Sequence, residues 1–401
     1  MSMIRDLEQI VTTVLPGDPS FRLIRREVLR RHIDQARQSA FATSKDEFLL
    51  SLMRLLALPG NGHTRLIPNN AISVLPLRFA TIGTTVRLLD AAPGFADAVG
   101  GDLISINGVP VDEIEAAAEP FLAGTHQRKR VIGPILFAWP GAVKHLGVYS
   151  GSGAFEYRIR SETGQIHDLL LDPASVVPGS TLYPRGEHGK ADGSWIPNSF
   201  LKIKDFDRAG LLLVLPSFFD PSKTALPDAI SEAAALVRSR PDTPLLIDIR
   251  GNTGGNFLQA MPLIEAISEG AEGRRVGLFM DKFTFSAAIV FTAILQHRLG
   301  DRLVLFGEEM GDGLTFFAEG GTIELSSSGA AVRYSTAFHD WAGGLTDETT
   351  PVEIGERIVP AGRLELNRFW AAQSDDDEAL YRFCQVVLDS FNTRPNGGFV
   401  R

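Results

Sequence analysis

The sequence predicts an α/β protein in which a helical N-terminal region and a β-rich module precede an α/β core. Three observations support this. Apolar residues recur at helical spacing up to about residue 65, and the period shortens to two between about 74 and 180. From about residue 199, apolar strands alternate with amphipathic helices. That alternation is typical of a parallel sheet with crossover helices, whose working residues gather at the carboxyl ends of the strands.

Composition limits the function classes. A chain of 401 residues suits two or three domains, and 44% hydrophobic with 22% charged residues is an ordinary globular balance. The net charge is −9, with acids and bases interspersed. A protein that binds a phosphate backbone needs a concentrated basic face, so we expect no nucleic-acid partner.

The single cysteine, Cys384, excludes an intrachain disulfide and a multi-cysteine metal site. It lies in an amphipathic stretch, 379–388, and we expect it to be a small core residue. The N-terminus carries no apolar signal core, and no apolar run reaches membrane-spanning length. As written, the sequence predicts a cytoplasmic protein; removal of an export signal would leave the same sequence in a periplasmic or secreted one.

The chain divides at turn signals. Residues 1 to about 65 predict helices, with Leu23, Val28 and Leu29 among the apolar residues at helical spacing. The loop 59–62 ends this pattern, and His63 follows at once. In the middle part, 101–111 predicts a strand, a tight Asn-Gly turn and a second strand. The stretch 173–198 reads as a linker or exposed loop. In the core, we expect strands at 211–215, 244–249, 276–280 and 303–306, and helices at 225–238, 257–267 and 286–298.

Two strand ends in the core could carry chemistry. The first, Asp-Ile-Arg-Gly-Asn-Thr-Gly-Gly-Asn at 248–256, leads into a helix, where exposed N–H groups could bind a phosphate or an oxyanion. The phosphate-loop and dinucleotide patterns both fail, because no Lys-Ser/Thr pair follows and the glycine spacing is wrong. The alternative is a glycine-rich turn without a role.

The second strand end is Lys-Phe-Thr-Phe-Ser-Ala-Ala-Ile at 282–289. Ser286 stands at a helix start among small neighbours, which leaves room for a substrate carbonyl. The plain alternative is a helix N-cap, a position that serine favours.

Together these two segments resemble the core of the tail-specific (C-terminal processing) serine proteases and their tricorn-type relatives. Gly-His-Thr at 62–64, the Gly-Asp-Leu-Ile-Ser-Ile-Asn-Gly strand at 101–108 and the glycine-rich loop at 307–313 agree with the family in order. The resemblance implies a helical region at 1–70, a PDZ-like β module at 71–180 and a crotonase-like ββα catalytic core at 195–401.

The resemblance also implies the site. Ser286 would be the nucleophile, with oxyanion donors from Gly254, Gly255 and Ala287. One branch of the family pairs the serine with a lysine some two dozen residues later, but no lysine follows Lys282. The tricorn-like branch uses the histidine of Gly-His-Thr, which is His63 here.

Imidazole titrates near neutrality, which suits a base that takes a proton from serine and returns it to the leaving amine. His339, at another strand end of the core, is the rival base. For the acid that orients the imidazole we favour Glu353 over Glu348 and Glu356, all of which precede Val-Pro at 359–360.

The function implied is a serine peptidase that cleaves peptides or protein C-terminal segments through an acyl-enzyme, with no metal or cofactor. Its partners would be peptides or unfolded proteins, and a homo-oligomer is allowed. The family commonly has Glu three residues after the serine, where this chain has Ile289. That departure favours the alternative, a catalytically silent relative that binds a peptide or hydrophobic ligand, as retinoid-binding members do. A third reading is a peptide-recognition scaffold acting through 74–130.

Overall fold

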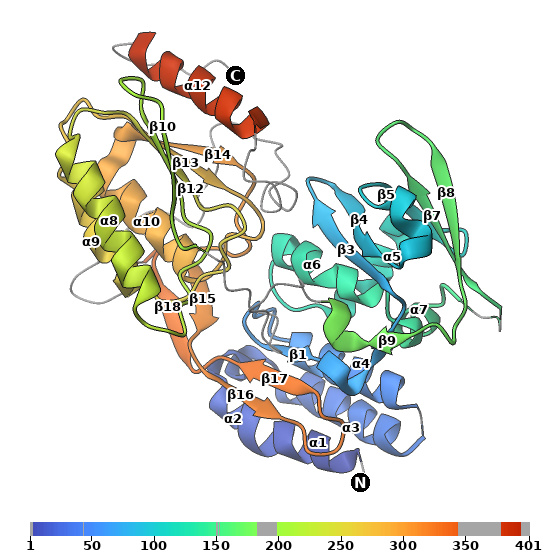
Figure 1. The fold of residues 1–401 in the computed structure, drawn as a ribbon. Helices are drawn as coiled ribbons and strands as arrows, with labels where there is room; N and C mark the ends of the chain where they lie inside the picture. The colour runs from blue at the N-terminus through green and yellow to red at the C-terminus, as the bar shows by residue number, and fades with distance from the viewer. Residues whose placement is uncertain are drawn as a thin grey trace. The chain divides into compact units, whose positions relative to one another are not determined.

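The computed structural model describes residues 3–42, 44–149, 151, 153–182, 199–343 and 378–393. The chain forms two compact units (Figure 1). The first, here the N-terminal unit, comprises Met1–Trp195 and Phe317–Phe338; the second, the sheet unit, comprises Ile196–Phe316 and His339–Arg401. The grouping differs from the three expected parts, because one hydrophobic core runs through the helical region and the β module and also takes in Leu325 and Val332.

Helices begin the N-terminal unit, as predicted. They are α1 (Ile4–Gln9), a π-helical turn η1 (Ile10–Val14), α2 (Leu15–Gly17), a 3₁₀ turn η2 (Pro19–Leu23), α3 (Arg26–Ala42) and α4 (Lys45–Ala57). Helix α4 starts at a capping box, in which the Ser44 hydroxyl accepts from the Glu47 N–H and the Glu47 carboxylate accepts from the Ser44 N–H. Its apolar side chains are buried, and the loop that carries His63 follows it.

An antiparallel sheet forms the β module of this unit. Its strands are β3 (Leu77–Ile82), β4 (Thr85–Ala91), β5 (Asp102–Ile106), β6 (Val109–Pro110), β7 (Phe155–Arg160) and β8 (Ile166–Leu171). They run in the order β3-β4-β5-β7-β8, with β6 paired to β5. The predicted Asn-Gly turn is confirmed: Asn107 and Gly108 join β5 to β6 with φ of 48° and 80°.

The expected strand pattern over 74–180 is wrong for its middle part, which is helical. The elements there are α5 (Val111–Ala118), η5 (Glu119–Phe121), α6 (His126–Ile132), η6 (Gly133–Leu136) and α7 (Pro140–His145). The sequence does contain a helical spacing there, because the apolar residues Ile114 and Ala118 are four positions apart. Both side chains are buried in α5.

Short pairings complete the N-terminal unit. Strand β17 (Ala331–Tyr334) lies between β1 (Arg65–Ile67) and β16 (Gly321–Glu324), and β2 (Ser73–Val74) pairs with β9 (Val177–Pro178). Three further 3₁₀ turns are η3 (Asn69–Ala71), η4 (Pro93–Ala98) and η7 (Gly179–Leu182). The segment 317–338 thus adds a hairpin to the strand that follows the His63 loop.

The sheet unit confirms the predicted parallel sheet. Its five strands, in order, are β10 (Lys202–Asp205), β11 (Leu211–Val214), β12 (Leu245–Asp248), β13 (Val276–Met280) and β14 (Leu303–Gly307). Only the β10–β11 pairing is antiparallel. The central strands are buried on both faces, as their continuous apolar runs require.

Helices cover this sheet. They are α8 (Ala225–Ser239), η8 (Phe257–Ala260), α9 (Met261–Ser268), α10 (Ala287–Leu299), η9 (Gly300–Arg302) and α12 (Glu378–Thr393). Helix α12 packs Leu380, Cys384 and Leu388 against the face that carries Leu246 and Phe279, opposite α8 and α9 (Figure 1). Cys384 is therefore a core residue, as expected.

Two paired strands, β15 (Thr315–Ala318) and β18 (Ala337–Asp340), carry the chain from the sheet unit into the segment 317–338 and back. Among the described helices, none combines the length and the apolar character needed to cross a bilayer.

Candidate active site

The loops that follow β12, β13 and β14 leave the same edge of the sheet, because these strands are parallel. We call them the glycine turn (249–256), the serine loop (281–286) and the β14 loop (307–311). Hydrogen bonds join each to the next, and the first two contain most of the residues that the sequence singled out.

Asn252 shapes the glycine turn from inside. Its side chain is fully buried and donates from Nδ2 to the carbonyl oxygen of Leu215, at 2.9 Å. Its Oδ1 accepts from the backbone N–H of Gly254, also at 2.9 Å. The turn is therefore tied both to the end of β11 and to itself.

The Gly254–Asn256 segment pairs with Phe218. The Phe218 N–H donates to the Gly254 carbonyl (3.0 Å), and the Asn256 N–H donates to the Phe218 carbonyl (2.8 Å). In this bridge the N–H and C=O of the middle residue, Gly255, point away from Phe218. Gly255 has φ of 138°, and an added Cβ would lie 1.9 Å from the Phe218 carbonyl carbon, so only glycine fits.

Asp281 organises the serine loop, and sequence reasoning missed it. Its Oδ1 accepts from the N–H groups of Gly251 (2.9 Å) and Thr284 (3.0 Å). The Phe285 N–H donates to the Asn252 carbonyl at 3.0 Å. The hydrogen bonds of Gly251 and Phe285 thus join the glycine turn to the serine loop, one at the start of the loop and one at the residue before Ser286.

Ser286 has a backbone conformation that is rare for any residue except glycine, with φ of 56° and ψ of −122°. It immediately precedes α10, and its side chain makes no capping hydrogen bond. The structure therefore does not support the N-cap alternative. Ala287 occupies the first position of α10, where a backbone N–H has no partner within the helix.

Gly254 approaches Ser286 closely. A Cβ added to Gly254 would lie 2.8 Å from the Cβ of Ser286 and 3.0 Å from the nitrogen of Ala287. Because the Gly254 N–H is already donated to Asn252, its contribution here is space rather than a donor. The other two expected donors are the N–H groups of Gly255 and Ala287, which take no part in the hydrogen bonds described above.

Lys282 is buried and forms an ion pair with Glu308 on the β14 loop, with Nζ 2.7 Å from Oε2. The Gly311 N–H also donates to the Thr284 carbonyl, at 2.9 Å. Both contacts fasten the serine loop to the end of the next strand. No local pattern around Lys282 or Glu308 indicated that the two residues pair.

A second ion pair lies beneath the glycine turn. The side chains of Asp248 and Arg250 are each only 1% exposed, and Arg250 contacts both carboxylate oxygens, through Nε at 3.1 Å and Nη2 at 3.0 Å. The pair fixes the chain where β12 ends and the turn begins.

His63 belongs to the N-terminal unit, on the loop between α4 and β1. It is buried, and its backbone N–H donates to Asn61 Oδ1 at 3.0 Å. The rival, His339, lies in β18 with its ring stacked on Phe316, the centroids 5.3 Å apart. Glu348, Glu353 and Glu356 lie outside the described residues.

Ile289 is completely buried in α10, whose first two turns are buried on every side. A carboxylate at this position would be removed from water. The departure from the family pattern therefore agrees with the apolar surroundings of this helix.

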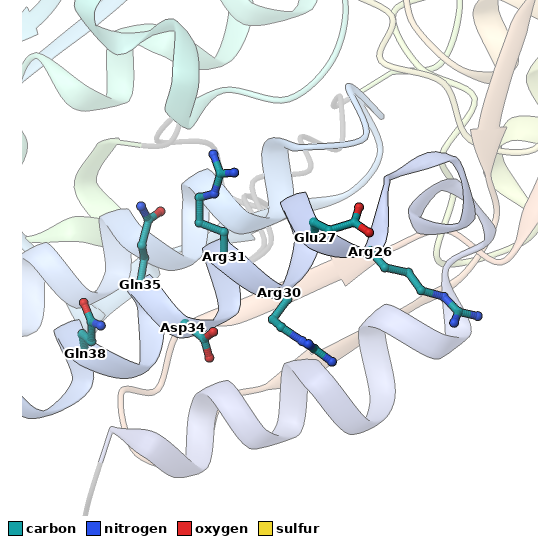
Figure 2. A pocket seen from close by; sticks show the side chains of 7 residues that line it. All are labelled: Arg26, Glu27, Arg30, Arg31, Asp34, Gln35 and Gln38. Carbon is teal, nitrogen blue, oxygen red and sulfur yellow. The ribbon is translucent and has the colours of Figure 1, made fainter.

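A hollow runs along α3 in the N-terminal unit (Figure 2). Its lining consists of charged and amide side chains: Arg26, Glu27, Arg30, Arg31, Asp34, Gln35 and Gln38. The predicted catalytic residues do not line it, so this hollow does not mark the candidate site.

No protein-family model matches the chain, and the comparison with curated proteins finds no relative. Among solved structures, mature CPAF complexed with lactacystin has a TM-score of 0.59 at 14% identity, covering 98% of this chain and 99% of that one. Mature CPAF alone gives 0.59 at 13% identity, with 100% and 99% covered. The photosystem II D1 C-terminal processing protease reaches only 0.40, at 14% identity and with 90% and 92% covered, which is too low to support an argument. Over its whole length, the chain shares the fold of CPAF.

Proposed function

We propose that the chain is a serine peptidase that cleaves peptides or protein C-terminal segments through an acyl-enzyme on Ser286. The backbone of Ser286 is the observation that carries this proposal. A strained serine between a strand and a helix, with a hydroxyl not used for capping, is how a nucleophile is presented in other hydrolases. The fold shared with the serine protease CPAF supports the proposal at the level of architecture.

A serine hydroxyl needs a base to remove its proton. In the proposal His63 accepts that proton as Ser286 attacks the substrate carbonyl, and then donates it to the departing amine. Glu353 would accept the other imidazole N–H and hold the ring in the required tautomer. Water then hydrolyses the ester by the same proton transfers in reverse order, and no metal or cofactor takes part.

The attacked carbonyl oxygen becomes an anion and needs donors that are already in place. The N–H groups of Gly255 and Ala287 are proposed for this role, and Gly254 lets the two approach each other. Removing one such donor typically lowers the rate by about 10²–10³-fold. We further propose that the sheet β3-β4-β5-β7-β8 is a PDZ-like peptide-binding module and that the sheet unit is a crotonase-like core.

A fluorophosphonate probe tests the proposal directly, with the labelled residue identified by mass spectrometry. We expect labelling at Ser286, loss of labelling in Ser286→Ala and strong slowing in His63→Ala. Ser239→Ala, an exposed serine in α8, is the matched control and should label like the wild type. Labelling that persists in Ser286→Ala would show that another residue is the nucleophile. Lactacystin, which CPAF binds in its complex, is a first compound to test as a competitor.

The alternative is a catalytically silent protein that binds a peptide or hydrophobic ligand at the same strand ends. Ile289 favours it, because the family commonly has Glu there. This alternative predicts no labelling of Ser286, together with peptide binding that Ser286→Ala leaves unchanged. A scaffold that acts through 74–130 would instead retain peptide affinity after substitutions throughout the glycine turn.

A further inference from the structure

Asp18 is a fully buried carboxylate that makes no ion pair with the described part of the chain. It stands between α2 and η2, where its Oδ1 accepts from the N–H (2.9 Å) and the hydroxyl (2.6 Å) of Ser20. Its Oδ2 accepts from the hydroxyl of Thr64 and from the N–H of Ser335, the latter at 3.3 Å. A carboxylate has about four acceptor positions, and neutral donors occupy all of them.

Through Thr64 the network reaches the loop that carries His63. Asn61 donates from Nδ2 to the Thr64 hydroxyl oxygen at 2.9 Å. The same amide accepts the His63 backbone N–H on Oδ1, at 3.0 Å. Asp18, Thr64 and Asn61 are all buried, so water does not compete for these bonds.

Ser335, which is distant in sequence, also belongs to this hydrogen-bond network. Asn61 Nδ2 also lies 3.0 Å from the Ser335 hydroxyl oxygen, and the Ser335 N–H is shared between Asp18 and Thr64. Ser335 directly follows β17, which is paired to the strand β1 that follows His63. Three segments distant in sequence therefore meet at the carboxylate of Asp18.

We infer that Asp18 is a positioning residue for the proposed general base: it sets the conformation of the loop 60–64 and, through Thr64 and Asn61, the backbone of His63. The inference rests on the proposed function for its catalytic consequence. The position of Asp18 requires a side chain with two acceptor oxygens. Each oxygen accepts from a backbone N–H that cannot turn away, one from Ser20 and one from Ser335.

Asp18→Asn breaks this arrangement at almost constant volume. Whichever way the amide is turned, its NH₂ group faces one of those two N–H donors, and the loop must shift. For a base displaced by about 1 Å we expect kcat to fall by about tenfold to a hundredfold, with KM changed by less than about twofold. Ser335→Ala, which removes only the hydroxyl, is the milder variant and should lower kcat by a smaller factor.

Asp6 provides a matched control in the same unit. It is also fully buried, and it accepts from the N–H groups of Ser327 (2.6 Å) and Ser328 (2.8 Å) in the same 317–338 segment. Within the described residues, no hydrogen bond joins Asp6 to the loop 60–64. Asp6→Asn should therefore lower the thermal stability comparably while leaving kcat near the wild-type value.

Amide hydrogen exchange at His63 gives a readout that does not depend on activity. In Asp18→Asn the His63 N–H should exchange at least about tenfold faster than in Asp6→Asn, because its acceptor Asn61 is released. Unchanged exchange in Asp18→Asn, or equal kcat losses in the two variants, would overturn the inference. If instead wild-type Ser286 does not react with the probe, the proposed function fails, and the exchange comparison still decides whether Asp18 holds the loop.

Discussion

Gly254 and Ser286 belong to loops from adjacent strands, yet the space for one methyl group is missing between them: a Cβ on Gly254 would lie 2.8 Å from that of Ser286. Such an approach places the peptide groups around Gly254 against the start of α10. For the proposed acyl transfer, this closeness lets backbone donors on two loops act on a single oxygen atom.

Gly254→Ala should therefore damage both stability and reactivity. With φ of 101°, alanine would be strained by about 1–3 kcal/mol, and the contact with Ser286 would push the serine loop away. We expect the fluorophosphonate labelling rate to fall by about 10²-fold or more, comparable to the loss of an oxyanion donor. Gly273→Ala is the control in the same unit, since its Cβ would meet nothing within 4 Å. Equal labelling rates in the two variants would contradict the importance of this contact.

The Asp248–Arg250 pair should be costly to break. Arg250→Ala takes this guanidinium away from a carboxylate that is 1% exposed, a change that typically costs about 3–5 kcal/mol. Urea unfolding at neutral pH measures the loss. Arg240→Ala, which removes a half-exposed partner of the exposed Asp205, should change stability little. A small effect of Arg250→Ala would mean that water or another group replaces the guanidinium.

The Lys282–Glu308 pair predicts a non-additive double variant. Glu308→Leu alone leaves the ammonium of Lys282, only 2% exposed, without this carboxylate and should cost roughly 3 kcal/mol. Adding Lys282→Met removes the stranded charge and should recover most of that loss, as replacement of buried ion pairs by apolar groups often does. Unfolding free energies of the four proteins form the test, and a double variant as unstable as the sum of the singles would refute it.

Acidification should change the stability of the fold in opposite directions through two carboxylates, Asp46 and Asp168. Burial raises the pKa of Asp46 above its ordinary value of 3.8, so the folded chain takes up that proton before the unfolded chain does. As the pH falls through this raised pKa toward 3.8, the wild type should therefore gain stability relative to Asp46→Asn. The hydrogen bond from Arg158 lowers the pKa of Asp168, so the wild type should lose stability relative to Asp168→Asn as the pH falls. Unfolding measured between neutral and acidic pH checks both slopes.

The parts of the fold that local patterns determine could be read from the sequence. Continuous apolar runs identified β11 to β14, and the Asn107-Gly108 pair identified its hairpin turn. Around the candidate site, the glycine-rich strand end stood out by its composition. Ser286 was singled out only by the resemblance to the tail-specific proteases, because a serine at a helix start is by itself most simply a cap. Helices α5 to α7 were missed because their short apolar repeats lie between clear strands.

Long-range pairings gave no such signal. The bond between Asp18 and Ser335 joins residues 317 positions apart, and neither residue is unusual in its local sequence. The grouping of 317–338 with the N-terminal unit likewise depends on the pairing of β17 with β1. The loss of Gly254 as a donor could not be foreseen, because it depends on how the Asn252 side chain folds back.

The hydrogen bond from Asn61 to Ser335 spans 274 positions of the chain, so a ribosome must add all of them before the loop that holds His63 is complete. At usual elongation rates that delay is on the order of tens of seconds. A growing polypeptide would carry His63 and, later, Ser286 before Ser335 can form its hydrogen bonds with Asn61 and Asp18. The hydrogen bonds that hold the His63 loop would therefore be complete only after residue 335 has been added.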